Sequence, residues 1–140
     1  QCEQTAGGSA CTKSGVCGKT PEAAALQDLL TYSLKGLALY AQEGRKVRVT
    51  DPEVNVFTCK ALFSTLTNVQ FDTTRLEEYV KKSVQLREAL RNKVKQAGGN
   101  GDLTDEAATF TPAGTTEGMI EQAQGKGFAP DPSAGRPGRC

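Results

Sequence analysis

Three cysteines near the start of the chain are the residues whose types and spacing could do chemistry. Cys2, Cys11 and Cys17 follow a C-x8-C-x5-C pattern within residues 1–20, a stretch rich in Gly, Ser and Thr that has no hydrophobic period. A thiolate is the soft, anionic donor that zinc and iron–sulfur clusters both select. A loop without a core of its own needs a reason to hold one conformation, and we predict that a bound metal or iron–sulfur cluster provides it.

The spacing of these cysteines is neither a zinc-finger pattern nor a common ferredoxin pattern, so it leaves reactive or merely neighbouring thiols as the alternative. Gly7, Gly8 and Gly15 would let the loop wrap a cluster and turn its backbone N–H groups toward the sulfides. Lys13 and Lys19 flank the cysteines and could offset the charge of an anionic cluster. We expect these two lysines to be solvated.

Composition excludes several classes of function. The chain has 140 residues, 37% of them hydrophobic, which is enough for one domain with a modest core. Seventeen basic residues against sixteen acidic ones give no electrostatic footprint for nucleic acid. No apolar run is long enough for a membrane span, and no signal peptide is visible, so we expect a cytoplasmic protein. The absence of histidine from these residues excludes a histidine-based catalytic triad and histidine metal ligands.

The hydrophobic spacing predicts a first long helix over residues 21–44. Thr20 supplies a capping hydroxyl, Pro21 suits the first helical position, Glu22 complements the helix dipole, and Gly44 is the expected C-terminal cap. The inward residues are predicted to be Leu26, Leu29, Leu30, Leu34, Leu37 and Tyr40.

A glycine lies inside this predicted helix. Gly36 costs the helix about 1 kcal/mol relative to alanine. Either another backbone approaches closely there, and the cysteine loop could be that backbone, or the helix simply tolerates the glycine.

A second helix is predicted to start at Thr50–Asp51–Pro52–Glu53, where glutamate follows threonine by three residues. Its predicted inward residues are Val54, Phe57, Ala61, Leu62 and Leu66. Cys59 lies in this run, and we interpret it as a small buried hydrophobic residue in preference to a fourth metal ligand.

A third helix is predicted from another capping box, at Thr74 and Glu77, to about Gln96. Its predicted inward residues are Leu76, Val80, either Ser83 or Val84, Leu90 and Val94.

Beyond residue 98 the composition shifts to Gly, Thr, Asp and Pro. We expect one helical turn at most within 103–110, a short helix over 116–124 that ends at Gly125, and disorder or dependence on further chain over 127–140. The predicted fold is a mainly α-helical three-helix bundle with a cysteine loop and an irregular C-terminal tail. Residues 1–20 form the loop, 21–97 the bundle, and 98–140 a linker, a short helix and the tail.

The sequence resembles the N-terminal domain of the hybrid-cluster proteins, also called prismane proteins or hydroxylamine reductases. The resemblance is carried by the segments CEQTAGG, CTKSGVCGK, ALQDLL, LKGL and LFSTLTNVQFD. It covers about the first two thirds of the chain.

The resemblance implies an iron–sulfur cluster, 4Fe-4S or 2Fe-2S, held by four cysteines of which the first two are spaced C-x2-C. Cys2, Cys11 and Cys17 match the second, third and fourth of these. The first would fall before Gln1, so we expect the chain to be part of a longer protein, truncated at both ends.

The function that the resemblance implies is the reduction of hydroxylamine to ammonia and water, with related nitric oxide chemistry. The catalytic hybrid iron–sulfur–oxygen cluster would lie in downstream domains, so no catalytic residue is expected in this chain. The domain would pass electrons from a reductase partner to those downstream domains, with no nucleic acid or membrane as partner.

The residues alone leave two other interpretations open. A cysteine-bound zinc could staple the loop of an interaction module, or the chain could be a metal-free helical adaptor. An iron–sulfur cluster absorbs visible light and zinc does not, so colour distinguishes the first two interpretations.

Overall fold

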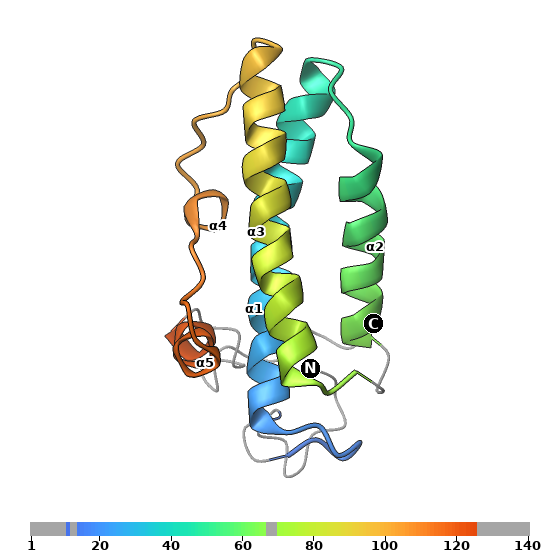
Figure 1. Ribbon diagram of the computed structural model, residues 1–140, viewed down its shortest axis with the longest axis vertical. Coiled ribbons are helices and arrows are strands. Elements are labelled where there is room, and N and C mark those ends of the chain that lie inside the picture. The colour runs from blue at the N-terminus through green and yellow to red at the C-terminus, as the bar shows by residue number, and fades with distance from the viewer. Residues whose placement is uncertain (1–10, 12–13, 67–69, 126–140) are drawn as a thin grey trace, which may run out of the picture.

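The computed structural model describes residues 11, 14–66 and 70–125, and these residues form helices and connecting loops without a β-strand. The helices are α1 (Pro21–Lys46), α2 (Pro52–Leu66), α3 (Thr73–Gln96), α4 (Glu106–Thr109) and α5 (Thr116–Gly125) (Figure 1). The mainly α-helical fold predicted from the sequence is therefore confirmed.

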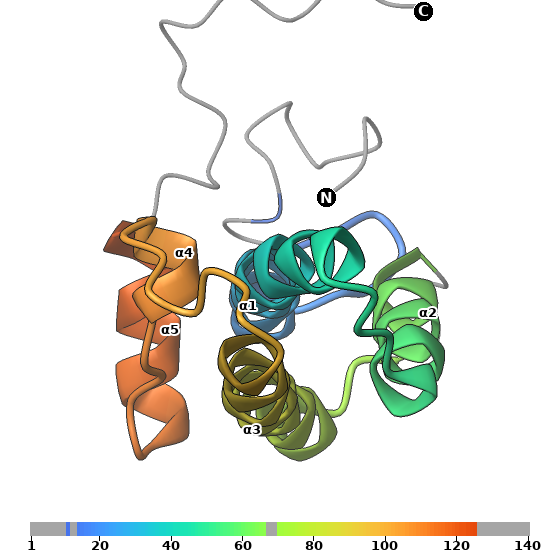
Figure 2. The same cartoon turned by 90° about the horizontal axis from the view of Figure 1, so that it is seen from above.

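Helices α1, α2 and α3 run up, down and up, which makes α1 and α3 parallel neighbours along most of their length (Figure 1). Seen along the bundle, α2 lies on one side of the α1–α3 pair, and α4 and α5 lie on the other (Figure 2). The predicted three-helix bundle is confirmed, and α1 contacts every other helix. No helix in the described parts of the chain is long and apolar enough to cross a membrane.

Helix α1 begins as predicted and ends later than predicted. The Thr20 hydroxyl accepts a hydrogen bond from the N–H of Ala23, 3.2 Å away. The predicted cap at Gly44 is wrong, because the helix continues to Lys46 and Gly44 is buried inside it. A Cβ at Gly44 would lie 2.8 Å from the carbonyl oxygen of Val49. Glycine is needed there for close packing of the returning chain, not for a cap.

Aspartates cap the next two helices, so the predicted Thr50 and Thr74 capping boxes are wrong. The Asp51 carboxylate accepts hydrogen bonds from the N–H groups of α2's first turn, and the Asp72 carboxylate does the same for α3. Asp51 also pairs with Lys93 at 2.7 Å, and this hydrogen bond holds the pKa of the Asp51 carboxyl below its ordinary value. A carboxylate is the stronger acceptor where the local backbone lets either side chain cap.

Helix α2 turns only one narrow face toward the bundle. Val54, Phe57 and Ala61 are buried as predicted. The inward prediction is wrong for Leu62 and Leu66, which are 42% and 78% exposed. Cys59 was predicted to be a small buried hydrophobic residue, and this prediction is also wrong because Cys59 is exposed. Three residues spaced i, i+3 and i+7 already cover the contact that one straight helix makes with its neighbours.

Helix α3 buries the predicted residues Leu76, Val80, Leu90 and Val94, and of the two candidates at 83 and 84 it buries Ser83. The Ser83 hydroxyl donates a hydrogen bond to the Ser33 hydroxyl on α1, 2.6 Å away. Two small hydroxyl side chains at this crossing let the parallel helices approach and satisfy each other's polar groups.

The close backbone approach predicted at Gly36 is present, but its partner is α4 and not the cysteine loop. A Cβ on Gly36 would lie 2.0 Å from the carbonyl oxygen of Ala107. Ala107, Ala108 and Phe110 are buried, and the Phe110 ring meets the ring of Tyr32 edge-on at 5.4 Å. The single predicted turn of helix is thus confirmed as α4.

The last described helix, α5, has the predicted bounds and buries Met119 and Ala123 in the same core. Described residues after position 98 therefore contribute to the core of the bundle. The predicted boundary between a bundle over 21–97 and a linker, short helix and tail over 98–140 stays a prediction. The expected irregular tail over 127–140 lies outside the described residues.

Replacing Gly36 by alanine should separate α1 from α4, since the added methyl group has no space against the Ala107 backbone. We expect Gly36→Ala to lower the free energy of unfolding by about 1–3 kcal/mol in urea denaturation. The control is Gly125→Ala, where a Cβ meets nothing within 4 Å; that change should be neutral or stabilising. Equal effects of the two changes would contradict the close approach.

Candidate functional site

Cys11 and Cys17 gather around Gly15 at the end of the bundle where α1 begins. A Cβ placed on Gly15 would lie 3.2 Å from the Cys17 sulfur and 3.5 Å from the Cys11 sulfur. Both thiols therefore border one small space, which exists because residue 15 has no side chain. Cys11 is buried and Cys17 is exposed, so this space lies between the protein interior and the surface. Cys2, the third predicted ligand, lies outside the described residues.

A short turn explains this arrangement. The N–H of Gly18 donates to the carbonyl oxygen of Gly15 at 2.9 Å, and the N–H of Gly15 donates to the carbonyl oxygen of Lys19 at 2.8 Å. Gly18 has φ of +87°, a conformation that favours glycine. The turn places Cys17 over Gly15 and delivers the chain to Thr20, the cap of α1.

Lys19 anchors this turn to the bundle, and the expectation of a solvated lysine is wrong for it. Its side chain is only 5% exposed, and Nζ donates to Oε1 of Gln27 at 2.6 Å. Gln27 in turn donates from Nε2 to the carbonyl oxygen of Gln70, 3.0 Å away. The Lys19 ammonium also lies 5.9 Å from the centre of the Phe71 ring. One hydrogen-bonded chain thus joins the cysteine turn, α1 and the segment that precedes α3. Lys13, the other flanking lysine, lies outside the described residues.

Sequence reasoning missed this anchor, although one signal was present. Gln27 occupies the buried face of α1 together with Ala23 and Leu30. A buried amide needs hydrogen-bond partners, and Lys19 lies eight residues before it in the sequence.

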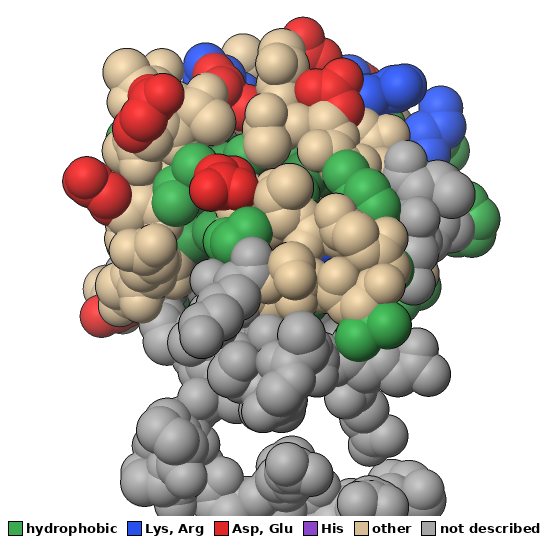
Figure 3. Space-filling model, turned by 90° about the horizontal axis from the view of Figure 1, so that it is seen from below, with side chains coloured by type: hydrophobic (Ala, Val, Ile, Leu, Met, Phe, Trp, Pro, Cys, Tyr) green, Lys and Arg blue, Asp and Glu red, His purple; other side chains and the backbone are tan. Residues whose placement is uncertain are grey.

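Two helix dipoles favour an anionic group at this end. The N-termini of α1 and α3 lie here with the positive ends of their dipoles, whereas α2 ends here with its negative end (Figure 1). The side-chain amide nitrogen of Gln70 is buried and finds no hydrogen-bond acceptor among the described residues. Seen from this end, hydrophobic side chains reach the surface near the centre with an acidic group among them, and further acidic groups and Lys or Arg groups lie toward the edges (Figure 3). The site offers thiols and N–H donors.

Two of the three predicted ligands, Cys11 and Cys17, thus lie close together at Gly15. Within the described part of the chain, no three side chains of the His, Cys, Asp and Glu types form a metal site. The polar side chains of the described residues 14–19 are Ser14, Cys17 and Lys19, so this turn offers no pair of carboxylates for acid–base catalysis.

Comparison with known proteins identifies the family. The sequence model of the prismane/CO dehydrogenase family matches residues 1–126. The chain belongs to this family. Its relatives include proteins named hydroxylamine reductase from Syntrophobacter fumaroxidans (61% identical over 132 residues) and Methanocella arvoryzae (56% over 131). Another, from Clostridium perfringens, is 46% identical over 125 residues.

Each match covers most of this chain and a minor part of the relative. The first two span 94% of this chain and 24% of the relative, and the third spans 88% and 23%. The chain therefore spans about a quarter of the length of these prismane-family relatives.

Prismane-family proteins are iron–sulfur proteins, and the residues present fit such a cofactor. Two thiols border a space that a Cβ would fill, beside two helix N-termini and a buried amide N–H group that lacks an acceptor among the described residues. Thiolates and sulfides are anionic acceptors, which these donors and dipoles stabilise.

Removing the acceptor of Lys19 should weaken the attachment of the cysteine turn. Gln27→Leu leaves a buried ammonium without its hydrogen bond, so we expect the free energy of unfolding to fall by about 1–3 kcal/mol. Adding Lys19→Met removes the charge and should restore part of that loss. Urea unfolding followed by circular dichroism measures both changes.

The control for this prediction is Gln42→Leu, on an exposed position of the same helix. If Gln27→Leu costs no more than Gln42→Leu, the Lys19–Gln27 contact does not anchor the turn.

Proposed function

We propose that this chain is the iron–sulfur electron-transfer domain of a hydroxylamine reductase, with Cys2, Cys11 and Cys17 as cluster ligands. The observation that carries this proposal is the close approach of the Cys11 and Cys17 sulfurs to Gly15. The assignment of the bound group as an iron–sulfur cluster is supported by the prismane family match. The assignment of the enzyme as a hydroxylamine reductase is supported by the names of the relatives.

The activity proposed for the whole protein is the reduction of hydroxylamine. One hydroxylamine takes up two electrons and two protons, the N–O bond breaks, and ammonia and water form. Related nitric oxide chemistry belongs to the same proposal. The catalytic hybrid cluster would lie in the remainder of the polypeptide, since the relatives are about four times as long as the matched region.

A bound 4Fe-4S or 2Fe-2S cluster would supply one-electron transfer at the cysteine turn. The residues of this chain hold and surround it. Cys11 is buried and keeps water from its side of the site, whereas Cys17 is exposed and marks the side open to an electron-donating reductase. The buried Gln70 amide provides an N–H donor near the Lys19–Gln27 anchor. Hydrogen bonds of this kind stabilise the reduced, more negative state of a cluster.

The test is to purify the chain without oxygen and record its visible absorption, iron and acid-labile sulfide. We expect colour in the parent chain and loss of most iron in Cys11→Ser and in Cys17→Ser. The control is Cys59→Ser, which changes an exposed cysteine on α2 and should leave iron and colour unchanged.

A version extended at its N-terminus to include the first cysteine of the family motif belongs in the same experiment. Colour only in the extended version would show that a fourth thiolate is required. A colourless chain that binds one zinc in both versions would support the zinc-stapled interaction module, and a folded chain that binds neither metal would support the metal-free module. Either result would contradict the electron-transfer proposal.

A further inference from the structure

Helix α2 has a second apolar face, on the side turned away from the bundle. Val56, Cys59, Phe63 and Leu66 follow one another at spacings of three, four and three residues, and all four are exposed. Val56 is 55% exposed, Phe63 66% and Leu66 78%. With 3.6 residues per turn, these positions form one continuous stripe along the helix. We call these four residues the outer stripe.

The outer stripe lies opposite the face that packs on the bundle. The buried residues Val54, Phe57 and Ala61 form an inner stripe. The helical period places the inner and outer stripes on opposite sides of α2. A surface helix normally has one apolar face and one polar face, whereas a helix that is apolar on both sides is normally buried on both sides.

The charge pattern agrees with this interpretation. Helix α2 has two charged residues, Glu53 and Lys60, in 15 positions, and none from Ala61 to Leu66. Helix α3 has ten charged residues in 24 positions. Because α3 belongs to the same bundle and is highly charged, the low number of charged residues is specific to α2 and not general to the bundle.

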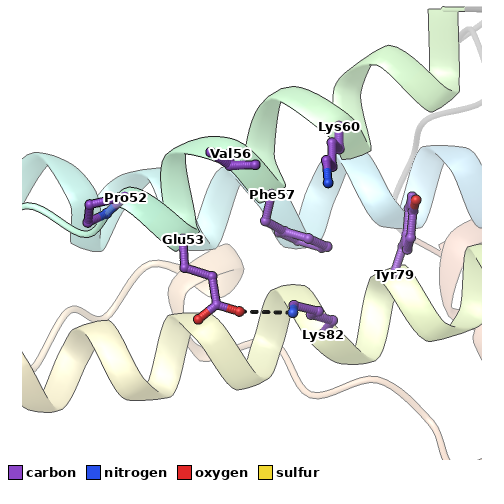
Figure 4. Close-up of a pocket in the computed structure, with 7 residues that line it drawn as sticks. All are labelled: Pro52, Glu53, Val56, Phe57, Lys60, Tyr79 and Lys82. Carbon is purple, nitrogen blue, oxygen red and sulfur yellow. Dashed lines mark hydrogen bonds and ion pairs between the residues drawn. The ribbon is translucent and has the colours of Figure 1, made fainter.

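A groove extends the outer stripe toward α3. It has a volume of about 540 Å³ and is bordered by Val56, Phe57 and Tyr79 (Figure 4). Phe57 and Tyr79 meet edge-on, with ring centres 5.8 Å apart. Lys82 pairs with Glu53 at 2.9 Å across the groove, and Lys60 lies at its border. The surface thus combines an apolar stripe with Lys60 and the Lys82–Glu53 ion pair at one edge.

We propose that the outer stripe and this groove are the docking surface for the remainder of the same polypeptide. The match to the S. fumaroxidans protein takes in 24% of that relative, so about three-quarters of such a polypeptide lies outside the matched region. A covalently linked partner has a high effective concentration, which favours it over a second molecule. The occupant is therefore an apolar surface of the downstream domains, with an acidic group positioned for Lys60. This inference rests on the proposed function only in taking the longer polypeptide to be the same enzyme.

Cys59 provides a natural probe because it lies within the outer stripe and is exposed. The rate at which N-ethylmaleimide modifies Cys59, read by mass spectrometry, is measured in two proteins. One is this chain, and the other is the full-length S. fumaroxidans hydroxylamine reductase with its matching region replaced by this chain. We expect Cys59 to react readily in the chain and at least about tenfold more slowly in the long protein.

The matched control is an Asn92→Cys, Cys59→Ser double variant, which places the probe on an exposed position of α3. That cysteine should react at similar rates in both proteins. Equal reactivity of Cys59 in the two proteins would overturn the proposal. So would protection of Cys59 in the isolated chain together with a dimer in sedimentation, because the occupant would then be a second copy.

Stability provides a second measurement on the same surface. Leu66→Ser should leave unfolding of the isolated chain nearly unchanged, since this side chain is largely exposed, and should destabilise the long protein. An equal effect in both proteins would contradict the proposal. Iron is measured separately in every sample, so failure to bind a cluster and failure to cover α2 are distinguishable results.

Discussion

Burial of α1 on nearly every side is the constraint on which the rest of the structure depends. Thirteen of its 26 residues are buried, and it contacts every other helix. Close approach then requires small residues at the crossings, which are Ser33 against α3, Gly36 against α4 and Gly44 against the returning chain. The same burial holds Gln27 inside the protein, where it binds Lys19 and fixes the cysteine turn at the start of the helix. Packing of the bundle and position of the site thus have one physical origin.

The helices could be predicted because hydrophobic spacing is a property of the sequence itself. Leu76, Val80, Leu90 and Val94 repeat at the helical period and are buried on α3 as expected. Helix ends were less predictable, since Thr and Asp neighbours both suit a cap and the folded backbone selects the aspartate. Helix α2 was mispredicted for another reason. Its two apolar stripes look like one wide inward face in the sequence, and only the packing shows that Leu66 points away from the bundle.

The site was predictable in its residue types and unpredictable in its geometry. Cysteine spacing and the resemblance indicated Cys11 and Cys17, but a Gly-rich loop has too many conformations for its shape to follow from sequence. The structure adds the turn at Gly18, the space at Gly15 and the buried Lys19. Lys19 was expected in solvent because lysine is rarely buried unless it is paired. Its partner, Gln27, lies eight residues later in the chain, on α1. The role of Cys2 remains a prediction, since it lies outside the described residues.

In the proposed site, the Cys11 and Cys17 sulfurs that approach Gly15 bind the cluster. Gly15→Val crowds both sulfurs without changing any thiol, and iron and sulfide per chain are then measured after reconstitution without oxygen. Gly114→Val is the control, because a Cβ there meets nothing within 4 Å. We expect Gly15→Val to keep its helical circular dichroism and to lose most of its iron, while Gly114→Val retains both. Full iron content in Gly15→Val would contradict binding of the cluster by the Cys11 and Cys17 sulfurs.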